Sequence, residues 1–238
     1  MRAWSIAAVA LLMGGLAYAA FVAPIDADQG FSQKIFYVHV PMAIVALIGF
    51  VYGGYAGIRH LQTRDSLWDL RSYVAIHLSL VLGVGVLLTG MVWAKAAWGS
   101  WFLWDEPTLV SFLIVFLLYC TYQPLRFSIE DHEKQGRYAS VFAVTAGAFV
   151  PLNFLAVRMS QEQTHPRVLN ASGGEMPTDM RIAFLLMLLG MVALFVTLWK
   201  LEISHKLTRG RIRRMRRRLG DPDAVAVGGR SAAPRVGL

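Results

Sequence analysis

The sequence has few charged residues and a single cysteine. Only 16% of its 238 residues are charged, while 56% are hydrophobic, and several apolar runs approach the ~20 residues that a helix needs to cross a bilayer. This composition excludes a soluble globular domain. The only cysteine, Cys120, lies within an apolar run. The chain therefore offers neither an internal disulfide nor a cluster of thiolates for redox chemistry.

Charged residues are almost absent from the middles of the apolar runs. A permease would place charges or broken helices near the membrane midplane, so this pattern disfavours that class. The runs predict an all-α polytopic membrane protein with six transmembrane helices, at about residues 4–22, 40–58, 72–93, 107–124, 138–157 and 181–203. The first run ends near Ala17-Tyr18-Ala19, which resembles a signal-peptide cleavage site. We favour an uncleaved first helix.

Basic residues are distributed unevenly between the two sides of the membrane. Most of the 23 Lys and Arg residues precede the first run, follow the last run, or lie in the 59–71 and 126–137 loops. By the positive-inside rule these segments are cytoplasmic, and so are both termini. The basic run from Lys206 to Arg218 follows a membrane helix directly, which favours membrane lipids over nucleic acid as its partner. We expect a membrane domain at 1–205 and a disordered cytoplasmic tail at 206–238.

Tryptophans are concentrated between the third and fourth runs, on the predicted outer side. Four of the seven lie there: Trp93, Trp98, Trp101 and Trp104. One or two would serve as interface anchors, but this density favours a platform for a large, flat, mostly apolar ligand, with haem as the leading candidate. Pro107 begins the fourth helix, and Asp105 or Glu106 is placed to cap it.

The six histidines divide by predicted side. Three fall among charged cytoplasmic residues and are expected to be solvated: His60, His132 and His205. We expect His77, inside the third helix, to bond between helices. His39 and His165 lie in the two outer segments that flank the aromatic one, and imidazole is a common axial ligand of haem iron. Each also has an ordinary alternative, as a helix cap and as a polar loop residue respectively.

Two motifs resemble those of a known family. Residues 98–105, Trp-Gly-Ser-Trp-Phe-Leu-Trp-Asp, resemble the tryptophan-rich WWD signature of the haem-handling proteins of cytochrome c assembly. Residues 37–41, Tyr-Val-His-Val-Pro, resemble the first outer-histidine motif of the cytochrome c maturation protein C (CcmC) branch. The likeness covers nearly the whole membrane region and not the tail. Phe102 replaces the second tryptophan of the usual pair, and Pro107 replaces an arginine for which Lys95 and Arg167 are candidate substitutes.

The resemblance implies a haem carrier and not an enzyme. It makes His39 and His165 the iron ligands of haem b, on a platform of Trp98, Gly99, Trp101, Phe102, Trp104 and Asp105. It places the protein in the bacterial cytoplasmic (inner) membrane. It further implies transfer of haem to a periplasmic haem chaperone, with ABC transporter subunits and a small membrane subunit as partners.

Three other classes compete with this interpretation. A b-type electron-transfer subunit would also bind haem, but such proteins commonly pair histidines deep in the bilayer, and here no single predicted helix carries two. A pure assembly scaffold would not need histidines. A mononuclear zinc or copper site would have only His39, His165 and Asp105 as obvious ligands, without a thiolate.

Overall fold

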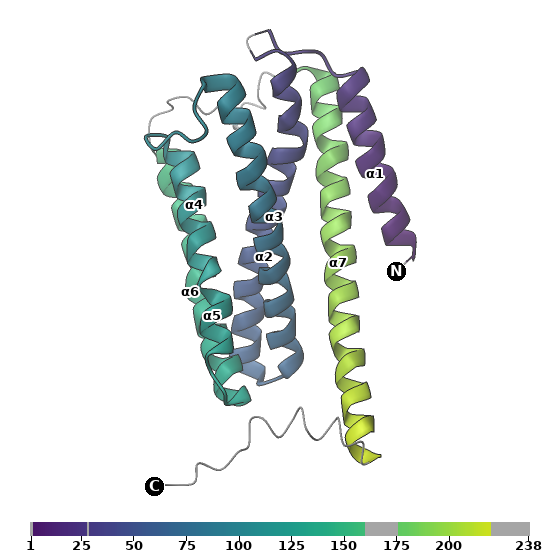
Figure 1. Cartoon of the computed structure of the whole chain (residues 1–238), viewed down its shortest axis with the longest axis vertical. Coiled ribbons are helices and arrows are strands. Elements are labelled where there is room, and N and C mark those ends of the chain that lie inside the picture. Colours follow the sequence, from purple (N-terminus) through teal and green to yellow (C-terminus); the bar gives the residue numbers. More distant parts are fainter. Residues whose placement is uncertain (1, 28, 160–175, 220–238) are drawn as a thin grey trace.

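The computed structural model describes residues 2–27, 29–159 and 176–219, which form a helical bundle without a β-strand (Figure 1). A short 3-10 helix, η1, spans Phe31–Ile35. The α-helices are α1 (Arg2–Phe21), α2 (Phe36–Thr63), α3 (Ser66–Trp98), α4 (Pro107–Cys120), α5 (Tyr122–Phe127), α6 (His132–Met159) and α7 (Thr178–Arg218). Their arrangement confirms the all-helical fold class predicted from the apolar runs.

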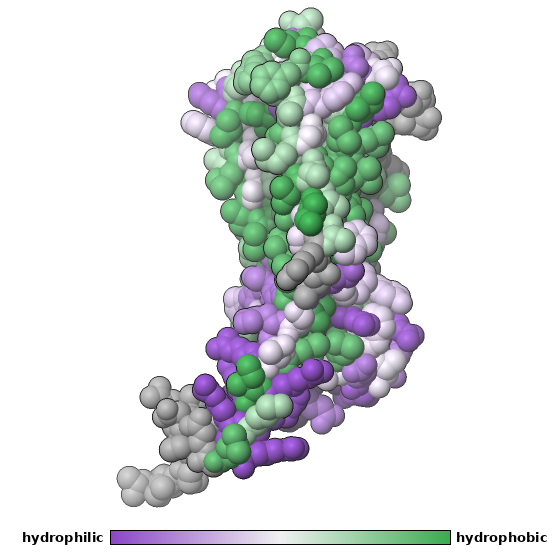
Figure 2. All heavy atoms as spheres, turned by 90° about the vertical axis from the view of Figure 1, so that its right-hand side faces the viewer, coloured by the Kyte–Doolittle hydropathy of each residue, from purple (hydrophilic) through white to green (hydrophobic). Residues whose placement is uncertain are grey.

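Among the residues that the structure describes, six helical segments are long and apolar enough to cross a membrane, as predicted. The helices α4 and α5 together make one of them, Pro107–Phe127. Large apolar side chains such as Ile6, Val81 and Leu152 are exposed. Figure 2 shows such residues covering the middle of one face, while polar residues gather around the lower part of α7. An apolar belt between polar ends is the surface that a bilayer requires.

The connections gather at two opposite ends of the bundle (Figure 1). The end formed by residues 22–27, 29–35 and 99–106, near the start of α7, carries the tryptophan-rich loop, and we call it the aromatic end. The other end, at the turns 64–65 and 128–131 and the last part of α7, is here called the basic end. For the described connections, the sequence therefore predicted correctly which of them lie at the same end of the bundle.

The second helix lies at the centre of the bundle, where α3, α6 and α7 all contact it. Gly54 of α2 and Gly147 of α6 allow a close approach of the two helices, because a Cβ on Gly54 would lie 2.9 Å from the Ala143 carbonyl oxygen and 3.2 Å from the Gly147 Cα. Small residues at such crossings bring helix backbones together in membranes, where dispersion forces drive packing. On the other side, α1 packs along α7, and Tyr18 donates a 2.9 Å hydrogen bond to Asp179. At the aromatic end, Phe36 and Tyr37 of α2 share a buried cluster with residues of α1, α3 and α7.

Several predicted helices were too short, because capping residues and not apolar runs set their ends. Asp65 caps α3 by accepting a 2.9 Å hydrogen bond from the Leu67 amide, and Gly99 ends that helix in the left-handed conformation at φ 76°. Six residues of the predicted polar loop at 59–71 therefore belong to α3. The helix α2 begins at Phe36, which places His39 inside the first turn and not at the helix edge. Pro41 is accommodated within that helix.

The seventh helix extends well beyond the apolar run predicted at 181–203. It continues to Arg218. Residues 206–218 are therefore helical, whereas the sequence analysis expected them to be disordered. Arg, Lys, Leu and Met are strong helix formers, and cations at a helix C-terminus interact favourably with its dipole. At 1.5 Å per residue, α7 is about 60 Å long, twice the ~30 Å hydrocarbon core. Its last part therefore projects from the basic end (Figure 1).

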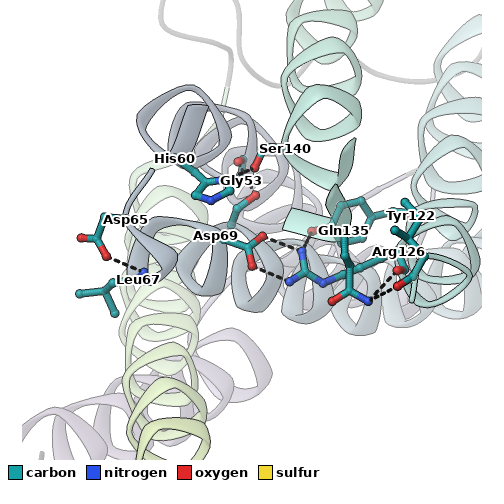
Figure 3. Close-up of polar contacts among 11 residues, drawn as sticks. Gly53, His60, Asp65, Leu67, Asp69, Tyr122, Arg126, Gln135 and Ser140 are labelled. Atoms are coloured by element: carbon teal, nitrogen blue, oxygen red, sulfur yellow. Dashed lines mark hydrogen bonds and ion pairs between the residues drawn. The ribbon is translucent and has the colours of Figure 1, made fainter. Parts of the chain in front are cut away.

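A polar network joins the helices near the basic end (Figure 3). Arg126 of α5 binds Asp69 of α3 in a bidentate pair at 2.7 and 2.6 Å. His60 Nδ1 lies 2.8 Å from the Ser140 hydroxyl, so the prediction that His60 is solvated was wrong. Its partner lies 80 residues away in the sequence. By contrast, His205 is exposed, and His77 Nδ1 lies 3.1 Å from Glu202 of α7, which confirms the predicted bond between helices.

Candidate functional site at the aromatic end

His39 lies half-buried in the first turn of α2, facing α3. Its Nδ1 is 2.9 Å from the Thr89 hydroxyl oxygen, and its ring meets Trp93 edge to face, with centroids 5.8 Å apart. The Thr89 hydroxyl also lies 2.8 Å from the Gly85 carbonyl of its own helix. Packing and a hydrogen bond therefore fix the imidazole, as a metal-ligating histidine requires.

Trp93 connects His39 to the first loop of the aromatic end. The ring is buried, and its Nε1 donates a 2.8 Å hydrogen bond to Gln29. Phe36 packs edge to face on the same ring at 6.4 Å. Trp93 thus belongs to the core beneath the site and supports the histidine, while the more exposed tryptophans lie further along the chain.

The segment after Trp93 remains helical through Trp98, which is half-buried. Gly99 then ends the helix with a positive φ. This conformation is strained for residues with a side chain but not for glycine. Lys95 donates a 2.7 Å hydrogen bond to the Gly99 carbonyl. This lysine stabilises the turn that begins the WWD loop, which we define as residues 99–106.

The WWD loop presents its large aromatic side chains to the surface. Trp101 is 55% exposed and Trp104 is 74% exposed, and Phe102 packs against Trp104 with ring centroids 4.7 Å apart. Asp105 is also exposed. Exposed rings that are available for stacking fit a flat, mostly apolar ligand with a polar edge.

Glu106, and not Asp105, is the N-cap of α4. Its side chain accepts a 3.5 Å hydrogen bond from the Thr108 amide, and it is buried at 4% exposure. Pro107 occupies the first helical turn as predicted. The capping alternative for Asp105 was therefore wrong, because the residue nearest the helix makes the bond. The exposed carboxylate of Asp105 therefore does not serve as the N-cap of α4.

The second predicted ligand, His165, lies outside the described residues, as does Arg167, one of the candidates to replace the missing arginine. Within residues 2–27, 29–159 and 176–219, no group of three or more His, Cys, Asp and Glu side chains is arranged to hold a metal ion. The pairing of His39 with His165 therefore stays a prediction.

Sequence reasoning missed Thr89, Gly90 and Trp93 as neighbours of His39. A signal was present, because Thr89 and Trp93 are four residues apart and share one face of a helix. Both residues lay within the helix predicted at 72–93. The sequence did not show that this face of the helix meets His39.

A protein family described as heme exporter protein C matches residues 1–218. The match includes the bundle, the His39 turn and the WWD loop. The chain belongs to the heme exporter protein C family. Family membership confirms the resemblance drawn from the WWD and outer-histidine motifs.

Relatives of the chain include heme exporter proteins C of bacteria and a mitochondrial protein. The heme exporter protein C of Rhodobacter capsulatus is 32% identical over 163 residues, which are 68% of this chain and 67% of the relative. That of Paracoccus denitrificans is 30% identical over 212 residues, 88% and 87% of the two chains. A putative cytochrome c biosynthesis ccmC-like mitochondrial protein of Marchantia polymorpha is 28% identical over 183 residues, 77% and 75% of the two chains.

Proposed function

We propose that the chain binds haem b at the aromatic end and transfers it to a periplasmic haem chaperone during cytochrome c maturation. The names of its relatives, which refer to haem export and cytochrome c biosynthesis, support the broad role. The observation that carries the specific site is His39, with Nδ1 at 2.9 Å from Thr89 and its ring against Trp93. A neutral imidazole held in this way is suited to coordinate iron through Nε2.

Each part of the site has a role in holding haem. His39 and His165 would be the residues that ligate the haem iron. Trp98, Trp101, Phe102 and Trp104 cover the porphyrin, with Gly99 forming the turn that presents them, and exposed Asp105 contacts the acceptor. No bond of the porphyrin is made or broken, so transfer is an exchange of iron ligands. A carrier that enclosed both faces completely would bind more tightly but release more slowly.

The distribution of charge supports an orientation. The basic end lies in the cytoplasm with both termini, and the aromatic end faces the periplasm of a bacterial cytoplasmic membrane. The partners at the aromatic end are then the haem chaperone and a small membrane subunit. ABC transporter subunits associate with the same complex, and anionic lipids contact the basic residues nearest the membrane.

A complementation experiment tests the function in cells. Bacterial strains that lack their own gene for this protein would express the wild type, His39→Ala or the matched control His205→Ala. The control removes an exposed histidine at the basic end. We expect His39→Ala to purify without haem. We also expect its cells to lack c-type cytochromes with covalently attached haem, as detected by haem staining, while His205→Ala retains both. Normal cytochrome c maturation with His39→Ala at equal membrane levels would refute the proposal.

A further inference from the structure

The contacts of the Thr89 hydroxyl favour one direction for its hydrogen bonds. Its oxygen lies 2.8 Å from the Gly85 carbonyl and 3.2 Å from the Val86 carbonyl, both on the preceding turn of α3. A hydroxyl has one hydrogen and two lone pairs. Donation of that hydrogen to a helix carbonyl is a common arrangement for threonine in helices. The oxygen then accepts a hydrogen bond from His39 Nδ1, which is 2.9 Å away.

This polarity selects one tautomer of His39. A neutral imidazole carries a single ring proton, and the hydrogen bond places it on Nδ1. The lone pair is then on Nε2, which is the form that binds a metal through that atom. In metal sites the partner of the other ring nitrogen fixes both tautomer and ring orientation.

The next residue, Gly90, allows the ring to reach this position. A Cβ at Gly90 would lie 2.9 Å from His39 Cε1, closer than a real Cβ approaches another atom. Cε1 is the ring carbon between the two nitrogens, so such contact would move both of them. Thr89, Gly90 and Trp93, all within about one turn of α3, therefore enclose one part of the ring.

We propose that Thr89 and Gly90 are positioning residues that hold His39 with Nδ1 protonated and Nε2 as the iron-binding atom. This inference rests on the proposed function. Thr89 acts through the hydrogen bond and Gly90 through the space that it leaves. Neither residue needs to touch the haem.

Substitution of Thr89 separates the hydrogen bond from packing. Thr89→Val keeps the side-chain shape but removes the acceptor, whereas Thr89→Ser keeps the hydroxyl. Thr197→Val is the matched control, because the buried Thr197 hydroxyl donates to its own helix at Ala193 in the same way. Purified full-length proteins would be titrated with haem and followed by the Soret band. We expect about 10- to 100-fold weaker binding for Thr89→Val, and near wild-type binding for Thr89→Ser and Thr197→Val.

A redox titration of the bound haem gives a second measurement. Donation from Nδ1 makes imidazole a more basic ligand and stabilises the oxidised iron. We therefore expect the reduction potential to rise in Thr89→Val and to stay unchanged in Thr89→Ser. A purely structural role would not produce this pattern.

Gly90→Ala tests the steric part of the proposal. Its control is Gly14→Ala in α1, where a Cβ meets no atom within 4 Å. We expect Gly90→Ala to lower the fraction of six-coordinate haem and Gly14→Ala to leave it unchanged.

The outcomes distinguish this inference from the proposed function. If wild type binds no haem at all, the proposed function fails. If wild type binds haem and Thr89→Val binds it equally well, only the positioning role is wrong. Equal loss in Thr89→Val and Thr89→Ser would also overturn it, because the retained hydroxyl should restore the bond.

Discussion

At the scale of single residues, the tryptophans of the aromatic end are of two kinds, a buried one that supports His39 and exposed ones at the surface. Trp93 is buried beneath His39, whereas Trp101 is 55% exposed. Removing a half-exposed ring should leave the fold intact but remove stacking area worth about 1–3 kcal/mol. That loss corresponds to roughly 5- to 150-fold in affinity.

We therefore expect Trp101→Ala to weaken haem retention and to insert normally into the membrane. Trp4→Ala is the control, because Trp4 lies near the start of α1, away from the aromatic end, and Lys200 lies over its ring. Soret titration of both purified variants measures the difference. Equal losses at Trp101 and Trp4 would mean that the tryptophans act only as interface anchors.

The adjacent carboxylates Asp105 and Glu106 should behave differently. Glu106→Ala removes the α4 cap and should lower the free energy of unfolding by about 0.5–2 kcal/mol. Asp105→Asn should leave stability and haem binding unchanged but impair delivery to the acceptor, and Asp105→Ala should impair it to a similar extent. Thermal unfolding and haem-stained cytochrome c separate the effects. Normal cytochrome c maturation with Asp105→Asn would contradict the proposed role of the Asp105 charge.

Residue-level prediction from sequence succeeded where neighbours in the chain decide and failed where distant partners decide. Pro107 at the start of α4 was readable from local rules. The contact of His60 with Ser140 was not, because it depends on how α2 and α6 cross. For the same reason, sequence alone did not reveal that Thr89 faces His39.

At the scale of elements, the apolar runs predicted which segments are helices but not where they end. Hydropathy marks the part of a helix inside the bilayer, while capping groups such as Asp65 and Gly99 set its limits. The largest difference is at α7, where the helix continues to Arg218 through residues of high helix propensity.

The length of α7 limits which of its basic residues can reach lipid. We place the membrane interface near Lys200, whose ammonium lies 4.8 Å from the Trp4 ring centroid, because tryptophan is enriched at that depth. Lys206 and Arg209 follow within roughly 15 Å along the axis, but Arg214 and Arg217 lie about 20–25 Å away. The attraction of anionic lipid, about 1 kcal/mol per basic residue, decays over a Debye length of ~8 Å.

We expect anionic lipid to stabilise the protein mainly through the nearer pair. The measurement is the thermal unfolding midpoint in nanodiscs of phosphatidylcholine with and without phosphatidylglycerol. Lys206→Gln with Arg209→Gln should reduce the difference between the two lipids, while Arg214→Gln with Arg217→Gln should not. Comparing lipids also cancels the loss of the Lys206 ion pair with Glu202. Equal reductions would show that the distal part of α7 lies on the membrane.

At the scale of the whole molecule, the two ends of the bundle differ in chemistry. Ion pairs and hydrogen bonds connect α2, α3, α5 and α6 near the basic end, while exposed aromatic rings and His39 occupy the other. The sequence predicted this division from the alternation of loops. It did not predict that α2 is central or that α1 packs on α7, because apolar faces in a bilayer do not specify their neighbours.

The absorption spectrum of the purified, detergent-solubilised full chain tests haem binding by two outer histidines most directly. We predict a Soret band and low-spin, six-coordinate haem in wild type. His39→Ala and His165→Ala should each lower haem occupancy or convert it to a more weakly bound species. A wild-type spectrum without a Soret band, even after excess haem is supplied, would contradict the account.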